Sequence, residues 1–279
     1  MGVRTLTFAV AVVTTLAAGL IVGAGCSSFS GASPAGDAGP DVAEPDASEA
    51  PPPAVLDASD AAPDAGGMID VGSFRIDAKE VTNADYNAFL EASLTLDAGV
   101  LSVPGCAFNV TFARKCSSKL DPDVPVTCIN WCDAAAYCAS VDKHLCGSLT
   151  GDELTFGDAL DPTKSEWMRA CAGIDGQAYP YGTTADAGLC QTNETADGGP
   201  TRSGSRPGCK GRPAGLFDMS GNVAEWEGSC SLDGAVQDNR CRVRGGSFKS
   251  NAVDAKCAAD SYVMRRQAMD DIGFRCCSR

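Results

Sequence analysis

Histidine is almost missing from this chain, which has one histidine, His144, among 279 residues. A catalytic triad or a three-histidine metal centre cannot be built from a single imidazole, although carboxylate and thiolate sites remain open. Basic side chains are also few, because 22 Lys and Arg stand against 36 Asp and Glu and give a formal net charge of −14. Nucleic-acid phosphates repel such a protein, so the sequence predicts no nucleic-acid partner.

Zinc-finger spacing is absent as well, since no C-x-x-C pair occurs and the series Cys128, Cys132, Cys138 has the wrong intervals. What the chain does have is 15 cysteines, all but one of them beyond residue 67. A dense and even set in an exported domain is typical of structural disulfides, so up to seven are expected, with their connectivity open. If Cys276 and Cys277 lie on a strand they face opposite sides, and we expect them to have different partners.

Residues 1–25 have the pattern of a secretory signal, because one charge, Arg4, precedes an apolar run over 6–24. The segment Val22-Gly23-Ala24-Gly25-Cys26 resembles a bacterial lipobox and predicts a lipid on Cys26. A plain signal peptide or an uncleaved membrane anchor remains the alternative, since the run is just long enough to span a bilayer.

The two residues after Cys26 are Ser27 and Ser28, which lack the acidic residue that resembles an inner-membrane retention signal. The prediction is therefore a lipoprotein of the cell envelope, attached to the outer membrane and facing the periplasm or the exterior. Residues 26–67 consist almost entirely of Ala, Pro, Asp, Gly, Ser and Glu. Such a segment cannot bury enough apolar surface to fold, so we expect a disordered acidic tether.

The remaining part, 68–279, is expected to fold as an α+β domain with little regular secondary structure. A capping box at Thr82 to Asp85 predicts a helix start. Hydrophobic periodicity predicts further helices and strands, namely helices at 133–140 and 165–171 and strands at 74–77, 242–244 and 272–275. Gly- and Pro-rich loops are expected to fill the rest.

Five segments in this domain resemble one family in the same order along the chain: Asp77-Ala78-Lys79-Glu80-Val81-Thr82-Asn83-Ala84-Asp85-Tyr86, Pro125-Val126-Thr127-Cys128-Ile129-Asn130-Trp131-Cys132-Asp133-Ala134, 215–226, Arg244-Gly245-Gly246-Ser247-Phe248 and Gly273-Phe274-Arg275. They look like the formylglycine-generating enzyme (sulfatase-modifying factor) family, which is also represented in ergothioneine-type sulfoxide synthases. The resemblance implies an irregular α+β fold related to C-type lectins. It does not by itself imply an activity, because function resides in the site.

The resemblance implies oxidation of a cysteine in a client protein to formylglycine, with O2 and a Cu(I) ion held by two thiolates. The family's two copper cysteines would correspond to Ser250 and Ala255, so both thiols are missing here. A tryptophan that lines the family's oxygen pocket corresponds to Ala224. These three departures at one site predict a domain that does not catalyse the reaction.

Two residues keep an oxidase alternative open. Ser247 remains at the family's serine position, although Phe248 follows it in place of a tryptophan. Cys257 lies two residues beyond the second copper position, so a shifted loop could form a displaced thiol pair that includes it. Copper would be a cofactor only in that case.

The iron-dependent branch of the family resembles a three-histidine site, which this chain cannot form. His144 stands where the family has a structural arginine, and an insertion of about 16 residues follows before the motif resumes at Ser165. We therefore expect His144 to be a structural or solvent-facing residue rather than a ligand.

A calcium site is the other inherited feature. By resemblance, Asp218 and Glu225 would supply carboxylates while Gly221 and Val223 supply backbone carbonyls, a donor set that suits a hard cation. An ordinary turn with a hydrogen-bonded buried acid is the alternative. Trp131, Trp167 and Trp226 are expected in the core.

Together these features predict an exported lipoprotein whose domain is a calcium-stabilised, non-catalytic binding or structural module. Its expected partners are the membrane, through Cys26, and an unidentified protein or small ligand. The alternative is an oxidase of the formylglycine-generating type that acts on a client protein through the displaced thiol pair.

Overall fold

The computed structural model describes residues 67–93, 102–195 and 197–279. The predictions for the signal, for the lipid on Cys26 and for the acidic tether up to residue 66 lie outside the described residues. Within the part that is described, no helix is long and apolar enough to cross a bilayer.

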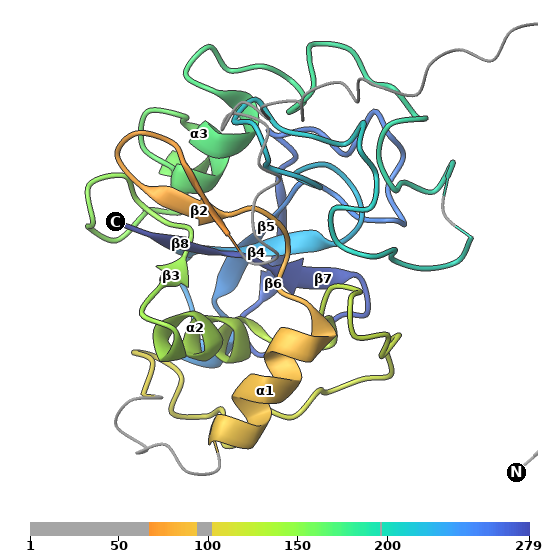
Figure 1. Cartoon of the computed structure of the whole chain (residues 1–279). Coiled ribbons are helices and arrows are strands. Elements are labelled where there is room, and N and C mark those ends of the chain that lie inside the picture. Colours follow the sequence, from red (N-terminus) through yellow and green to blue (C-terminus); the bar gives the residue numbers. More distant parts are fainter. Residues whose placement is uncertain (1–66, 94–101, 196) are drawn as a thin grey trace, which may run out of the picture. The chain divides into compact units, whose positions relative to one another are not determined.

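Short helices and strands alternate with long irregular loops (Figure 1). The helices are α1 (Asn83–Ser93), α2 (Trp131–Ser140) and α3 (Glu166–Ala172), with short 3-10 turns η1 (Asp158–Leu160) and η2 (Val236–Asp238). The strands are β1 (Met68–Asp70), β2 (Arg75–Asp77), β3 (His144–Leu145), β4 (Ala224–Cys230), β5 (Arg240–Arg244), β6 (Ser261–Met264), β7 (Ile272–Phe274) and β8 (Cys276–Ser278). The mixed, loop-rich α+β domain predicted from the sequence is confirmed.

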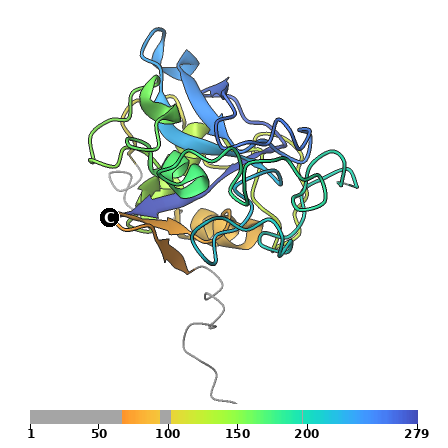
Figure 2. The ribbon, with the colours of Figure 1, turned by 90° about the horizontal axis from the view of Figure 1, so that it is seen from above.

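The strands form two sheets, ordered β1-β2-β8-β3 and β6-β5-β4-β7. In the first sheet the C-terminal strand β8 lies between β2 and β3, so the two ends of the domain meet there (Figure 2). In the second sheet β4 pairs with β5 antiparallel and with β7 parallel. This arrangement places the segment after β5 next to the starts of β4 and β7.

Side-chain caps explain where the helices begin. The hydroxyl of Thr82 accepts a hydrogen bond from the Asp85 backbone N–H (3.2 Å), and the Asp85 carboxylate accepts one from the Thr82 N–H (3.0 Å). Asn130 and Asp133 form a second reciprocal capping box, which makes α2 begin two residues earlier than predicted. Ser165 caps α3 by accepting a bond from the backbone N–H of Met168.

Two hydrophobic clusters form the core. One lies around α1 and α2 and includes Tyr86, Ile129, Trp226 and Phe274, and the other surrounds Trp167 on α3. Trp167 and Trp226 are fully buried as predicted, whereas Trp131 is only partly buried and its indole N–H donates to the backbone carbonyl of Glu227.

Seven disulfides link all fourteen cysteines of the domain, as the cysteine count predicted: Cys106–Cys132, Cys116–Cys128, Cys138–Cys276, Cys146–Cys277, Cys171–Cys257, Cys190–Cys209 and Cys230–Cys241. The adjacent Cys276 and Cys277 have different partners, which confirms the expectation from strand geometry.

Several strands were not predicted from the sequence, namely β1, β3, β4 and β6. The region from 224 to 230 was expected to be a turn and loop, but it forms β4, one of the two central strands of the second sheet. Two of its acids are buried in ion pairs. Glu225 pairs with Arg275, which is distant in sequence, and Glu227 pairs with Arg244 on the neighbouring strand β5. Strand β6 was also unassigned, because its residues are largely exposed.

Candidate functional site

A glycine turn after β5 lies against Ser250 and Ala255, the two positions that the resemblance matches to copper cysteines. Gly245 and Gly246 have φ of +79° and +69°, a conformation that favours glycine. A Cβ added at Gly246 would lie 3.0 Å from the Ser250 hydroxyl and 3.1 Å from the Ala255 Cβ. Ser250 and Ala255 therefore both lie next to Gly246, and neither of them carries a sulfur atom.

Next to this turn lies a cavity of about 420 Å³, which we call the Ser247 cavity. Each strand of the second sheet contributes one apolar side chain to it: Ala224 from β4, Val243 from β5, Val263 from β6 and Ile272 from β7. Ser247, Ser250, Asp254, Lys256, Asp260 and Asp271 supply polar groups around these. The small side chain of Ala224, where the family has a tryptophan, is part of this wall.

Ser247 lines the cavity and is held by neighbouring polar groups. Its hydroxyl donates to the Asp271 carboxylate (2.9 Å) and accepts from the Lys249 backbone N–H (3.2 Å). Asp271 also lies 3.7 Å from the Lys249 ammonium. The described lining contains no thiol and no imidazole, so the carboxylate of Asp271 is the group that the Ser247 hydroxyl contacts there.

Cys257 is not at this cavity, which corrects the prediction of a displaced copper thiol. It forms a disulfide with Cys171 on α3, and both residues are fully buried in the cluster around Trp167. Neither cysteine lines the Ser247 cavity. The geometry therefore makes Cys257 a structural residue.

The turn that leads into β4 is held by a buried arginine. Arg275 binds both carboxylate oxygens of Glu225, from Nη2 to Oε1 and from Nε to Oε2, at 2.7 Å each. The Trp167 indole N–H also donates to Oε2 (2.8 Å). Arg275 further donates to the backbone carbonyls of Asp77 and Phe217, so the C-terminal segment anchors two other parts of the fold.

Two more acids face the same arginine, and with Arg275, Glu225 and Trp167 they form what we call the Arg275 cluster. Asp218 accepts a bond from the Gly204 N–H through Oδ2, while its Oδ1 has no hydrogen-bond partner. Burial raises the pKa of Asp218 to about 6, and the charge of Glu225 adds to the effect.

Glu80 is the acid in this cluster that the sequence did not single out. Its Oε1 accepts from the Asn222 amide (2.9 Å), and its Oε2 has no partner. Burial, and then the charge of Asp218, raise the pKa of Glu80 well above its ordinary value. It belongs to the 77–86 motif, but a single acid inside a motif gives no sign of burial. Three acids thus face one guanidinium.

The Arg275 cluster fits the predicted calcium site only in part. Asp218 offers a free carboxylate oxygen close to the tight turn at Gly221, whose φ is +75°. Glu225 offers none, because Arg275 and Trp167 occupy both of its oxygens. Among the described residues no three His, Cys, Asp or Glu side chains are arranged to hold a metal ion, so a calcium ion here would need backbone carbonyls such as those of Gly221 and Val223.

His144 has the structural role expected for it. It lies on β3, and its Nε2 is 2.8 Å from the Glu166 carboxylate, which also accepts from the Gly147 N–H. No second histidine exists in the chain to join it.

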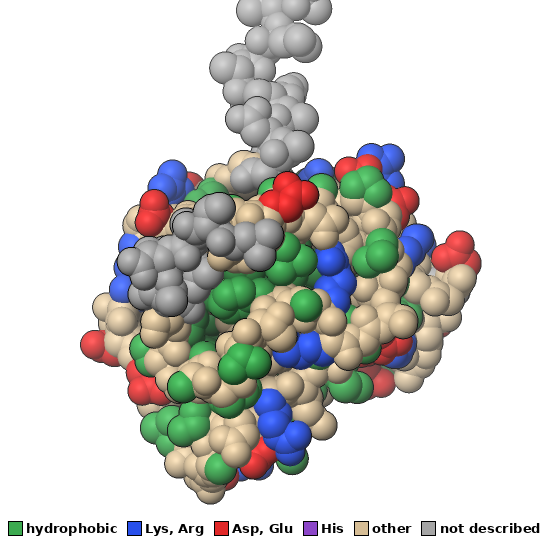
Figure 3. All heavy atoms as spheres, turned by 90° about the horizontal axis from the view of Figure 1, so that it is seen from below, with side chains coloured by type: hydrophobic (Ala, Val, Ile, Leu, Met, Phe, Trp, Pro, Cys, Tyr) green, Lys and Arg blue, Asp and Glu red, His purple; other side chains and the backbone are tan. Residues whose placement is uncertain are grey.

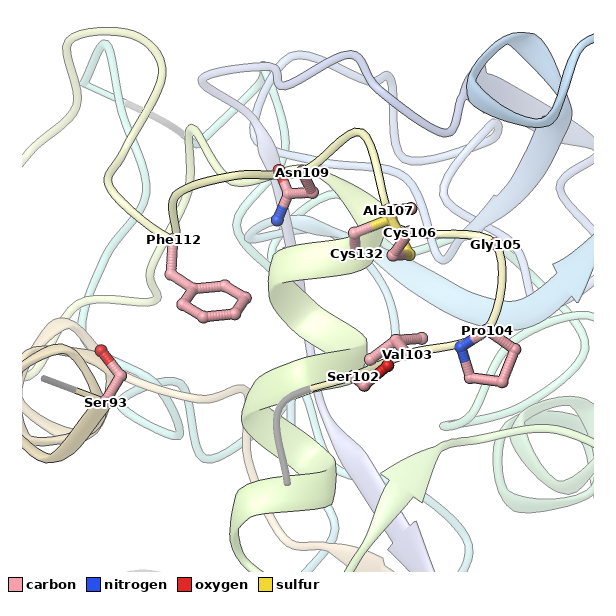
Figure 4. A pocket seen from close by; sticks show the side chains of 10 residues that line it. All are labelled: Ser93, Ser102, Val103, Pro104, Gly105, Cys106, Ala107, Asn109, Phe112 and Cys132. Atoms are coloured by element: carbon pink, nitrogen blue, oxygen red, sulfur yellow. A yellow bond between two sulfur atoms is a disulfide. The ribbon is translucent and has the colours of Figure 1, made fainter. Parts of the chain in front are cut away.

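A larger cavity of about 530 Å³ lies between α1, α2 and the 102–112 segment (Figure 4). The Cys106–Cys132 disulfide, Val103 and Phe112 form much of its wall, and none of the described residues that line it has a titratable side chain. On the face shown in Figure 3, basic and acidic side chains are interspersed with hydrophobic ones, and the basic ones do not form a continuous patch.

Comparison with known proteins agrees with this geometry. Residues 48–279 match the model of the sulfatase-modifying factor enzyme 1-like domain family. The chain is 31% identical over 173 residues to the inactive C-alpha-formylglycine-generating enzyme 2 of Bos taurus, which covers 56% of this chain and 50% of that protein. It is 22% identical over 263 residues to the formylglycine-generating enzyme of Bos taurus, covering 75% and 66% of the two chains.

A solved structure of PvdO from Pseudomonas aeruginosa has the same fold, with a TM-score of 0.52, 18% identity and coverage of 74% of this chain and 80% of that one. The chain belongs to the sulfatase-modifying factor family. It spans about half of the length of the inactive relative, so that protein's properties do not transfer to this chain as a whole.

Proposed function

We propose that this protein is a non-catalytic member of its family, which uses the Ser247 cavity to bind a small ligand or a side chain of a partner protein. The observation that carries the proposal is that seven disulfides use all fourteen cysteines of the domain while the copper positions hold Ser250 and Ala255. Cu(I) needs soft thiolate ligands, and none is free there.

The cavity supports the binding role. It is lined by one apolar side chain from each strand of a four-stranded sheet and by several polar groups, which is the usual makeup of a ligand pocket. An inactive relative in the same family supports the loss of chemistry. The alternative function, an oxidase that converts a cysteine of a client protein, would require the buried Cys171–Cys257 disulfide to open.

The test is an oxidation assay on the full chain with Cu(I), O2 and a cysteine-containing peptide, with product detected as a carbonyl adduct. We expect no formylglycine. Product formed by the wild-type chain, and lost in Cys257→Ser, would establish the oxidase alternative and overturn the proposal. An active formylglycine-generating enzyme serves as the positive control for the assay.

Binding is tested by mass-resolved screening of small-molecule fragments against the wild type and Ala224→Trp. An indole at 224 would project from the cavity wall and displace a bound fragment. Fragments that bind the wild type but not this variant support the cavity as the site, whereas binding that is equal in both places the ligand elsewhere. Val110→Trp, on an exposed loop residue, controls for the added aromatic surface.

We also propose calcium at the Asp218 turn, supported by the free Asp218 oxygen and by the excess of buried acids.

Attachment of the chain to a membrane through a lipid on Cys26 remains a prediction of the sequence. Mass spectrometry of the exported protein, compared with Cys26→Ser, tests it through the mass of the N-terminal peptide. An unmodified Cys26 peptide would contradict it.

A further inference from the structure

One disulfide differs from the others in exposure. Every disulfide-bonded cysteine of the domain is buried except Cys116, which is exposed to solvent. Thiol–disulfide exchange begins with attack of a thiolate on one of the two sulfur atoms, so access to that sulfur limits the rate. Cys116 is therefore the cysteine that an incoming thiol reaches most readily.

Its partner, Cys128, has an unusual backbone conformation. Cys128 has φ of +62°, one of four non-glycine residues with positive φ among those described. A residue with a Cβ is disfavoured in this region and stays there only when its surroundings fix it. The disulfide to Cys116 is one such constraint, and the hydrogen bond from the Lys115 N–H to the Cys128 carbonyl (2.7 Å) is a second.

Cys128 is also connected to the wall of the Ser247 cavity. Its backbone N–H donates to the carbonyl of Met269 (2.9 Å), and Met269, Asp271 and Ile272 line that cavity. A change in the backbone of Cys128 would move the donor of this bond. The exposed disulfide is thus one hydrogen bond away from the 269–272 segment.

We propose that Cys116–Cys128 is a thiol–disulfide exchange site whose reduction by a dithiol loosens the 269–272 wall of the Ser247 cavity. One thiolate of the dithiol attacks the Cys116 sulfur and forms a mixed disulfide, and Cys128 leaves as a thiolate that takes a proton. The second thiol then closes the oxidised dithiol and releases Cys116. Two electrons pass to the protein, which gains two thiols. The exchange site stands whether or not the cavity binds a ligand.

The chain contains a matched control in Cys230–Cys241. The two disulfides close loops of nearly equal length, with sequence separations of 12 and 11, so the chain entropy that favours closure is similar. Cys230 and Cys241 are both buried and are directly paired between β4 and β5. A difference in reactivity between the two disulfides would then reflect access and backbone conformation.

The first experiment titrates the full chain with dithiothreitol, quenches with acid, alkylates and locates the labels by peptide mass spectrometry. We expect Cys116 and Cys128 to be labelled at a dithiothreitol concentration at least tenfold below that needed for Cys230 and Cys241. Simultaneous labelling of the two pairs, or earlier labelling of any other pair, would overturn the exchange site.

The second experiment measures hydrogen exchange on the chain reduced and alkylated at this pair alone, and on Cys116→Ser/Cys128→Ser. We expect faster exchange at 265–272 in both samples and no change there in Cys230→Ser/Cys241→Ser. Unchanged exchange at 265–272 in the selectively reduced chain would refute the link to the cavity. Because that sample has the wild-type sequence, the result does not depend on the variants folding.

Discussion

The Ser247 cavity and the Arg275 cluster adjoin the two ends of one short segment, 218–224, yet they are packed in opposite ways. Ser250 and Ala224, which the resemblance matches to a copper cysteine and a tryptophan of the family, line the cavity, and open volume remains there. At the Arg275 cluster every charged group is buried and most are hydrogen-bonded. The cavity thus has open volume beside the turn at Gly246, whereas the cluster is filled by charged groups that bond to one another.

The largest loss of stability is expected for Arg275→Met, which leaves Glu225, Glu80 and Asp218 without their guanidinium. Removing one partner of a buried ion pair typically costs 3–5 kcal/mol, and we expect about that loss in the free energy of unfolding. Denaturant unfolding with the disulfides intact measures it. Arg279→Met is the control, because the Arg279 side chain is 46% exposed and 3.9 Å from its acid. Equal effects of the two substitutions would contradict a special role for Arg275.

The next prediction concerns calcium binding at Asp218 in the same cluster. If it binds at Asp218, calcium at 100 times its dissociation constant adds about 2.7 kcal/mol to the free energy of unfolding. We expect a higher unfolding temperature in calcium than in EDTA for the wild type, and no difference for Asp218→Asn. An identical unfolding temperature in both buffers would contradict the calcium site. Protons and Arg275 alone would then balance the charge of the buried acids.

At the cavity the corresponding substitution should matter less. Ser247→Ala removes one hydroxyl that donates to Asp271, whose side chain is 19% exposed and can be hydrated instead. The expected loss is about 1 kcal/mol. Lys249→Ala removes a surface ion pair to Asp270 and should cost less than about 0.5 kcal/mol. A loss for Ser247→Ala as large as that for Arg275→Met would show that the cavity also holds the fold.

The last prediction combines a small effect on stability with a gain of copper binding. Ser250→Cys/Ala255→Cys places two thiols on either side of Gly246, where an added atom would already touch both side chains. We expect the free energy of unfolding to change by less than about 1 kcal/mol and Cu(I) binding to appear. A competition titration with a chromophoric Cu(I) chelator measures it. Ser250→Ala/Ala255→Ser, which adds no thiol, is the control and should not compete.

Helix starts and the number of disulfides could be predicted because their signals are local. Thr82 and Asp85 satisfy each other within one turn, and an even cysteine count needs no knowledge of the fold. The mapping of Ser250 and Ala255 onto the copper positions stays a prediction from the resemblance, although both residues do lie against the glycine turn at Gly246.

Strand β4 and the role of Glu80 could not be predicted, because both depend on distant partners. Glu225 was expected as a calcium ligand or a buried acid of a turn, and Glu227 was not singled out. Each is buried against an arginine, Arg275 or Arg244, that the sequence does not connect to it. For the same reason Cys257 was misplaced. Its position relative to Ser247 gave no hint that Cys171, 86 residues earlier, would be its partner.

The most direct test of the central claim is a count of free thiols in the wild-type chain. The protein is unfolded in denaturant without reductant, alkylated, and mapped by peptide mass spectrometry, so that every unpaired cysteine carries a label whether or not it was buried. The account predicts no label anywhere in 68–279. Labelled Cys257, alone or with a second cysteine, would show that a thiol is available for copper and would contradict the claim that this domain has lost the family's chemistry.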